Sequence, residues 1–314
     1  MHLAEGILPL GQAVAWSAVA TPVVAWSLAG APRAEALEES PSQGSSPMVL
    51  LAGATSLLFA ATLLPLPVPV VGATSHICLT PVLALIIGVR QIIWPTFFVL
   101  VLQAVFFAHG GLTTLGINTL TLGAFGPLLA VGLWAPIRRL GLNNKFGLAL
   151  TCAFADLGIY VGDAMALGLA LSDAAPPLTT FTAVLLGFAP VQIPLAILEA
   201  VASVGIVQIL AGRRPDLLPD RLRALGSTPP RATLLSLVFL LALVSPGCAY
   251  EGIDGTVFGA TAESLGRPPT DSLLDLSQGE LGLAMTIIVL FGLGFVAGRA
   301  WERLLGRQPD ASRR

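Results

Sequence analysis

Two long stretches of the chain carry no charged side chain, and this feature limits the possible fold more than any other. No Lys, Arg, Asp or Glu occurs between Glu39 and Arg90, or between Arg90 and Arg138. A helix that crosses the hydrocarbon core of a bilayer needs about 20 apolar residues, so each stretch has room for two crossings. The sequence therefore predicts an all-α, polytopic integral membrane protein that folds as a bundle of helices.

The composition agrees with a chain surrounded by a lipid bilayer. Hydrophobic residues make up 55% of the 314 residues and charged residues 11%, whereas about 25% of the residues in a soluble domain are charged. The net charge of -2 gives no indication of nucleic-acid binding. The three cysteines, Cys78, Cys152 and Cys248, lack the paired spacing of a disulfide framework or a zinc knuckle, so we interpret them as buried thiols.

Hydropathy predicts nine transmembrane helices. The third is short, about 21 Å at 1.5 Å per residue, which suits a helix that begins below the surface at a cavity. Two prolines, Pro190 and Pro194, are expected to kink or break the seventh. The predicted spans are Ile7 to Ala29, Met48 to Leu66, His76 to Val89, Gln91 to Ala108, Thr119 to Ile137, Phe146 to Leu171, Thr180 to Ala211, Thr233 to Ser245 with its flanks, and Leu281 to Ala300.

The basic residues predict an orientation. If the N-terminus lies outside and the C-terminus in the cytoplasm, every one of the 16 Lys and Arg residues except Arg267 falls on the cytoplasmic side. A basic loop near residues 216–231 separates the first seven spans from the last two. We therefore expect a seven-helix core over residues 1–218 and a two-helix accessory module over residues 219–314. The acidic external segment at about 250–279 is expected to be partly flexible.

His2 has a chemical argument of its own. The start of the chain has no basic region and no cleavage site typical of a signal peptide. We expect the mature protein to begin at Met1 with a free amine, because a bulky second residue generally prevents removal of the initiator. That amine, the next amide nitrogen and the His2 imidazole would form fused chelate rings, and such planar nitrogen donors suit Ni(II) or Cu(II).

The other two histidines, His76 and His109, also fall at the external ends of predicted spans, although each alone could be an isolated interfacial or core imidazole. His76 follows the turn "VGATS" and could complete a four-nitrogen set. Cys78 could offer a sulfur, though a packed core thiol is the competing interpretation. His109 lies in "LQAVFFAHGGLTTLGINTL", which we expect to pass through a glycine-rich loop containing Gly110, Gly111, Gly116 and Asn118 and to cover a site.

Three acidic residues, Asp156, Asp163 and Glu199, lie within predicted spans and should face the protein interior. They leave open a gradient-driven secondary transporter that uses them as a proton path. A membrane metalloenzyme is a further alternative, but Glu5 is the only candidate general base near His2 in the sequence. The only lysine, Lys145, lies outside any G-x-x-x-x-G-K-[ST] pattern, so this chain lacks a Walker A loop and active transport would need partner subunits or an ion gradient.

Several motifs together resemble the substrate-binding membrane component of cobalt/nickel energy-coupling-factor transporters. They are the "MH" start with "EGILP", the "GATSH" turn, the "LQAVFFAHGGLTTLGINTL" run and "EAVASVGIVQILAGRRPDLL", which together cover about residues 1–218. The last two helices and "SPGCAYEGIDGTVFGATAES" are similar to the small accessory component of the same systems, here fused to the core.

The resemblance implies a substrate-specific subunit that captures Ni(II) or Co(II) outside the cell and releases it inward. A separate membrane coupling subunit and two ATPase subunits would drive release, and the chain would hold no prosthetic group and be no enzyme itself. The ion would be held by the terminal amine of Met1, the backbone nitrogen and imidazole of His2, and His76. The residues expected to support these ligands or to gate the site are His109, Asn118, Ser75 and Cys78.

Overall fold

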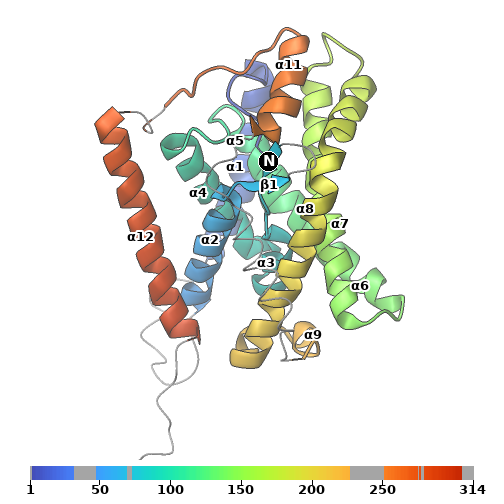
Figure 1. Ribbon diagram of the computed structural model, residues 1–314, viewed down its shortest axis with the longest axis vertical. Helices are drawn as coiled ribbons and strands as arrows, with labels where there is room; N and C mark the ends of the chain where they lie inside the picture. The colour runs from blue at the N-terminus through green and yellow to red at the C-terminus, as the bar shows by residue number, and fades with distance from the viewer. Residues whose placement is uncertain are drawn as a thin grey trace, which may run out of the picture.

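A computed structural model of the protein describes residues 2–31, 47–68, 73–226, 251–274, 276 and 279–305. Long helices lie side by side in a bundle (Figure 1), and the chain is a multi-pass membrane protein. Within these residues, six helical stretches are long and apolar enough to cross a membrane. They are α1 (Leu10–Ala29), α4 (Val89–Phe106), Leu115–Arg139, α7 (Asn144–Ala170), α8 (Pro177–Arg213) and Gly282–Arg303 within α12 (Gly279–Leu305).

Two further predicted spans correspond to shorter helices, α2 (Pro47–Leu63) and α3 (Thr80–Ile87). The predicted span from Thr233 to Ser245 lies outside the described residues. The count of nine spans and the placement of the N-terminus outside therefore stay predictions. Past α8 the chain forms a 3-10 turn, η3 (Pro215–Leu217), and a short helix, α9 (Asp220–Arg223), at the end of the bundle opposite α11 (Figure 1).

Helix α3 is shorter than predicted, and His76 and Cys78 precede it. Leu79 adopts a left-handed conformation with φ 59°, Pro81 stands in the first turn, and Gly88 ends the helix with φ 95°. At 1.5 Å per residue its eight residues rise about 12 Å, too short to cross a bilayer. Every residue from Thr80 to Ile86 is buried, so α3 is an internal half-helix that begins beside the histidine-bearing segment.

The span Leu115–Arg139 consists of α5 (Leu115–Asn118), a π-helical stretch η2 (Thr119–Phe125) and α6 (Gly126–Arg139). The expected loop is therefore wrong beyond Leu115, because Gly116 and Asn118 are helical. The helical conformation has a packing reason. A Cβ atom on Gly116 would lie 2.6 Å from the Ser17 backbone nitrogen, so only glycine lets α5 approach the backbone of α1 this closely.

Three short strands correct two other expectations. Strand β1 (Leu66–Val68) pairs antiparallel with β2 (Ala73–Ser75), and β2 pairs parallel with β3 (Glu251–Gly252). The "GATSH" segment is thus part of a small sheet and not a turn. The external segment is ordered over residues 251–264, where a π-helical turn, η4 (Asp254–Gly259), and helix α11 (Ala260–Ser264) follow β3, because Ile253 and Phe258 are buried in the same apolar core as Leu3.

Helix α8 runs without interruption through Pro190 and Pro194, so the expected break is absent. Neighbouring helices can satisfy the backbone groups that a proline frees inside a membrane helix. The three intramembrane acids, Asp156, Asp163 and Glu199, are all buried, as predicted.

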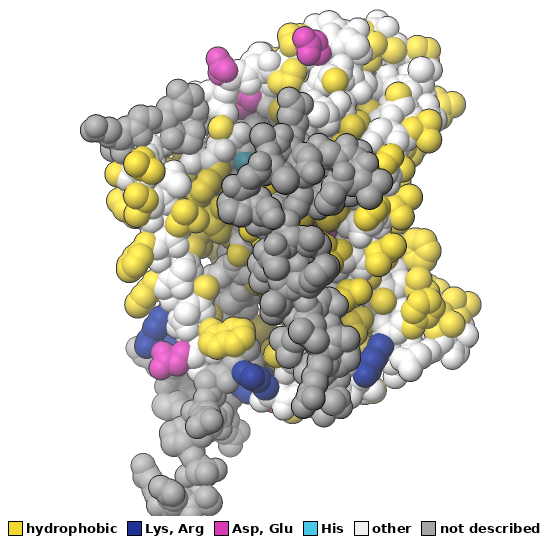
Figure 2. All heavy atoms as spheres, in the orientation of Figure 1, with side chains coloured by type: hydrophobic (Ala, Val, Ile, Leu, Met, Phe, Trp, Pro, Cys, Tyr) yellow, Lys and Arg dark blue, Asp and Glu magenta, His cyan; other side chains and the backbone are white. Residues whose placement is uncertain are grey.

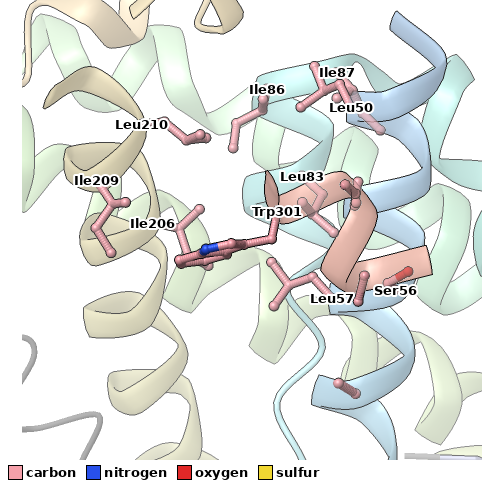
Figure 3. Close-up of a pocket in the computed structure, with 15 residues that line it drawn as sticks. Leu50, Ser56, Leu57, Leu83, Ile86, Ile87, Ile206, Ile209, Leu210 and Trp301 are labelled. Carbon is pink, nitrogen blue, oxygen red and sulfur yellow. The ribbon is translucent and has the colours of Figure 1, made fainter. Parts of the chain in front are cut away.

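The surface separates into an apolar flank and charged ends. Figure 2 shows Lys and Arg side chains at one end of the visible face and most Asp and Glu side chains at the other. The flank is hollowed by an apolar cavity of about 360 Å³, into which the ring of Trp301 on α12 points from one side (Figure 3). Residues of α2, α3 and α8 form the other walls, including Leu50, Leu83 and Ile206.

The close approach of α1 and α5 makes a testable prediction. Gly116→Ala should lower the free energy of unfolding by about 1–3 kcal/mol, the usual cost of forcing extra atoms into a packed site. Gly132→Ala is the matched control, since a Cβ atom there meets nothing within 4 Å. Thermal unfolding in detergent should show a lower midpoint for Gly116→Ala alone, and equal midpoints would contradict the packing described here.

Candidate metal centre

The three histidines come together although they lie on three separate segments. His2 is in the N-terminal tail, His76 follows β2, and His109 lies in the loop after α4. One ring nitrogen from each lies within 4.8 Å of the other two. The ring centroids are 4.5 Å apart for His2 and His109, 5.1 Å for His2 and His76, and 5.6 Å for His76 and His109.

The N-terminal tail is held in place by its own backbone. The Leu3 N–H donates to Asn118 Oδ1 at 3.0 Å, and Asn118 Nδ2 donates back to the Leu3 carbonyl at 3.2 Å. Thr114 Oγ1 also donates to this carbonyl, at 2.5 Å. Leu3 and Ile7 are fully buried in the apolar core. The tail is therefore anchored directly after His2. These contacts hold the backbone that positions the imidazole in the cluster.

Glu5 anchors the next turn of the tail to the histidine-bearing loop. Its carboxylate accepts hydrogen bonds from the backbone N–H groups of Leu112 and Thr113, at 2.7 and 3.1 Å, and from the Thr113 hydroxyl. A Cβ atom on Gly111 would lie 2.7 Å from the Glu5 backbone, so glycine is required there for the tail to lie against the loop. These bonds occupy the one carboxylate that the metalloenzyme alternative offered as a general base.

His76 is held from two sides. Ser75, in β2, is paired with Leu66 of β1. On the other side, both oxygens of the Glu199 carboxylate accept backbone N–H groups, Oε2 from Cys78 at 2.7 Å and Oε1 from Leu79 at 3.0 Å. The interior hydrogen-bonded role predicted for Glu199 is thus confirmed. It satisfies two buried donors of an irregular segment that the membrane could not hydrate.

The segment after β3 reaches the same place from the far end of the sequence. Asp254, the first residue of η4, accepts the His2 backbone N–H through Oδ2 at 3.1 Å. Thr270 donates its N–H to the Glu5 carbonyl at 2.9 Å. A residue more than 250 positions away therefore contacts the very nitrogen that the chelate argument assigns to the metal.

The electrostatics of the cluster favour neutral nitrogen donors. Burial lowers the pKa of His2 and of His76 well below the usual histidine value, and lowers the pKa of His109 to about 4. All three imidazoles are therefore uncharged at neutral pH, which is the form that binds a metal. Within the described part of the chain, neither ring nitrogen of His2 nor Nε2 of His109 has a hydrogen-bond partner, although all three atoms are buried.

Buried polar atoms without partners are costly unless a ligand satisfies them. Three imidazoles that can each aim a nitrogen at one point are donors suited to Co(II), Ni(II), Cu(II) or Zn(II). The cluster is therefore chemically fit to take up a first-row transition-metal ion as substrate.

The structure brings some of the predicted site residues together and separates others. His2, His76 and His109 are brought together, while Met1 lies outside the described residues. Asn118 fixes the tail, and Ser75 Oγ lies 3.5 Å from the Tyr160 hydroxyl. Cys78 belongs to a separate group, with its sulfur near carboxylates of α7 and α8.

The sequence did not predict the roles of Asp254 and Thr114. No local signal marks either residue, because both act through contacts between distant segments.

The sequence is similar to proteins of known family over most of its length. A family model described as "CbiM: Cobalt uptake substrate-specific transmembrane region" matches residues 2–217. The "Cobalt transport protein CbiM" of Geobacter sulfurreducens is 33% identical over 98% of this chain and 91% of its own length. The protein of the same name from Sorangium cellulosum is 38% identical over 73% of this chain and 99% of its own length.

Solved structures show the same fold. The crystal structure of a truncated transition metal transporter superposes with a TM-score of 0.52 at 22% identity, covering 67% of this chain and 98% of that chain. A second transition metal transporter structure gives 0.50 over the same share of this chain. The family model covers more than half of the sequence, and both named relatives are matched over most of their length. The chain therefore belongs to the CbiM family of cobalt uptake proteins, as their substrate-specific transmembrane component.

Proposed function

We propose that this protein is the substrate-specific component of an ATP-driven energy-coupling-factor importer for Co(II) or Ni(II), and that it captures the ion at its extracytoplasmic end. The observation that carries the proposal is the convergence of three uncharged, buried imidazoles at one end of the bundle. Family membership supports cobalt as a substrate. Nitrogen donors bind Ni(II) more tightly than Co(II) in the general order of stability, which keeps nickel as an alternative.

The proposed ligands are the terminal amine of Met1, the backbone nitrogen and imidazole of His2, and His76. Because Met1 would contribute its free amine, intact-mass measurement of the purified protein is a necessary first check. His109 would lie beside the bound ion and support its ligands or gate the site. Loss of the proton from the His2 amide would leave that nitrogen free for the metal, and Asp254 is placed to accept this proton because it already accepts the N–H.

The proposed orientation places the histidines outside. Lys and Arg side chains lie at the opposite end of the visible face from most of the Asp and Glu side chains (Figure 2), and basic residues concentrate on the cytoplasmic side of membrane proteins. The proposed division is a capture core over residues 1–218 and an accessory module over 219–314. Asp254 and Thr270 of the module form hydrogen bonds with the N-terminal tail, which supports a contribution of the module to the site.

Energy for release would come from a membrane coupling subunit and two ATPase subunits, since this sequence carries no Walker A pattern. A gradient-driven transporter is the competing mechanism. Cobalt uptake by cells that express the whole system should stop when the ATPase subunits are disabled. Uptake that continues and instead follows the proton gradient would establish the competing mechanism.

The ligand set predicts a graded response to substitution. His2→Ala and His76→Ala should each weaken Co(II) binding by more than about 100-fold, because even residues that merely support ligands contribute 10–100-fold. His109→Ala should lower the affinity by about 10–100-fold. Isothermal titration calorimetry on the purified protein measures each value. Gln12→Ala, whose side chain donates to the Leu169 carbonyl away from the cluster, should bind like the wild type. Full affinity in His2→Ala would exclude the proposed site.

The pH dependence separates the amine from the imidazoles. An α-amine ordinarily has a pKa of about 7.7–8.0 and must lose its proton to bind a metal. Binding would also release the proton of the His2 amide, and each released proton lowers the affinity about tenfold per pH unit. Affinity for Co(II) should therefore fall by roughly 100-fold as the pH is lowered from about 7.5 to 6.5, about tenfold from the amine and about tenfold from the amide. The imidazoles add nothing to this fall, since burial keeps their pKa values below 6.5 and they stay neutral. A fall of only about tenfold over this interval in calorimetric titrations would remove the amine from the ligand set.

A further inference from the structure

A second group of potential metal ligands is buried in the bundle, and it is linked to the histidine cluster by the two-residue separation of His76 and Cys78. It consists of Cys78 in the segment before α3, Asp156 on α7 and Glu199 on α8. One ligand atom from each, a sulfur and two carboxylate oxygens, lies within 4.8 Å of the other two. The exposed fraction is 0% for Cys78, 1% for Asp156 and 0% for Glu199. We call these three residues the thiol–carboxylate cluster.

Among the described residues, no positive side chain forms a salt bridge with either carboxylate. In the described part of the chain, the salt bridges join Arg214 to Asp216, Arg223 to Asp220 and Arg299 to Glu302, and none involves the cluster. An ionised carboxylate is costly to bury unless it is paired or coordinates a metal. Two of them beside one thiol therefore need a proton or a cation between them.

The hydrogen bonds of the cluster leave carboxylate lone pairs available to bind a metal ion. Glu199 uses both oxygens to accept backbone N–H groups of Cys78 and Leu79, but each carboxylate oxygen has a second lone pair. Asp156 Oδ2 accepts from Gln192 Nε2 at 2.7 Å. Asp156 Oδ1 is buried and has no hydrogen-bond partner among the described residues. This buried oxygen, on a residue that is 1% exposed, would be satisfied by a bound cation or by a proton shared with Glu199.

The position of the cluster connects the histidines to the opposite end of the protein. Cys78 follows His76 by two residues and stands directly before α3. Helix α3 then leads away from the histidines, and at its far end Arg221 of α9 donates to the Leu85 carbonyl at 3.1 Å. Along the chain, Cys78 of the thiol–carboxylate cluster therefore stands between His76 and the helix that leads to the basic end of the bundle.

We propose that the thiol–carboxylate cluster is a second binding site for a divalent transition-metal ion, one step inward from the histidines. Sulfur and carboxylate oxygen together suit Co(II), Zn(II) or Cd(II), and they do not enforce the square-planar geometry that Ni(II) takes with four nitrogens. The thiol must give up its proton to solvent when the metal binds. A role of the cluster as a site through which the ion passes on its way inward rests on the proposed function. The ability of the cluster to bind a metal ion does not.

Cobalt itself provides a signature that only sulfur ligation produces. A thiolate bound to Co(II) gives an intense ligand-to-metal charge-transfer band in the near ultraviolet, which nitrogen and oxygen ligands do not give. The experiment titrates the purified, reduced full chain with Co(II) and records both the absorption band and the number of ions bound. All proteins carry Cys248→Ser, because this cysteine lies outside the described residues and must not contribute.

The expected result is two bound ions and a charge-transfer band. Cys78→Ser should lose the band and retain one ion, and that retained ion shows that the variant is folded. Asp156→Asn should weaken the band-forming event by at least about tenfold, as expected for loss of a metal ligand. Cys152→Ser is the matched control, since Cys152 is also fully buried, and it should keep both ions and the band.

His2→Ala separates this inference from the proposed function. If it keeps the band with a single ion, the inner site binds independently of the histidines. If wild type binds a single ion without a band, the histidine site stands and the second site is overturned, with the two carboxyl groups sharing a proton instead. A band that survives Cys78→Ser and disappears in Cys152→Ser would also overturn the proposal. If the band is present but neither His2→Ala nor His76→Ala lowers the number of ions bound, the proposed function is overturned and this inference is supported.

Discussion

The site depends on one constraint, which is that the first residues of the chain must be held as part of the protein core. A free tail would lose several degrees of freedom on binding a metal, and that entropy would oppose binding. Here the cost is met during folding, because Leu3 is buried and both its backbone groups are bonded to Asn118. Glu5 adds bonds to the loop that carries His109. The histidine cluster is thereby preorganised before an ion arrives.

The same tail is also held by residues from the C-terminal third of the chain. Strand β3 extends the small sheet next to His76, and Asp254 and Thr270 bond to the backbone of the tail. Segments that sequence alone assigns to different modules thus share one structure at this end of the bundle. Because the half-helix α3 begins next to this structure and contacts α9, the histidine end of the bundle is linked to the basic end through a short, largely buried element.

The sequence predicted the helical architecture well where the physics is local. Apolar stretches long enough to cross a bilayer satisfy their backbone groups there by forming helices, so α1, α4, α7 and α8 lie where hydropathy predicted helices. The strands could not be predicted, because two or three residues carry no periodicity and their pairing joins segments far apart. The sequence predicted that the three histidines lie at one end of the spans, and the structure brings them together, but the contacts of Asn118, Glu5 and Asp254 arise only from tertiary structure. The convergence of Cys78 with Asp156 and Glu199 has the same origin.

The central claim is that the chain's own N-terminus binds the ion, and one added residue tests it directly. A variant with a single glycine ahead of Met1, its presence verified by intact mass, moves the amine away from His2 and keeps all three imidazoles. The account predicts that calorimetry will detect no saturation by Co(II) at concentrations that saturate the wild type, with an unchanged thermal unfolding midpoint in the absence of metal. Binding equal to that of the wild type would contradict the claim and assign the ion to the three histidines alone.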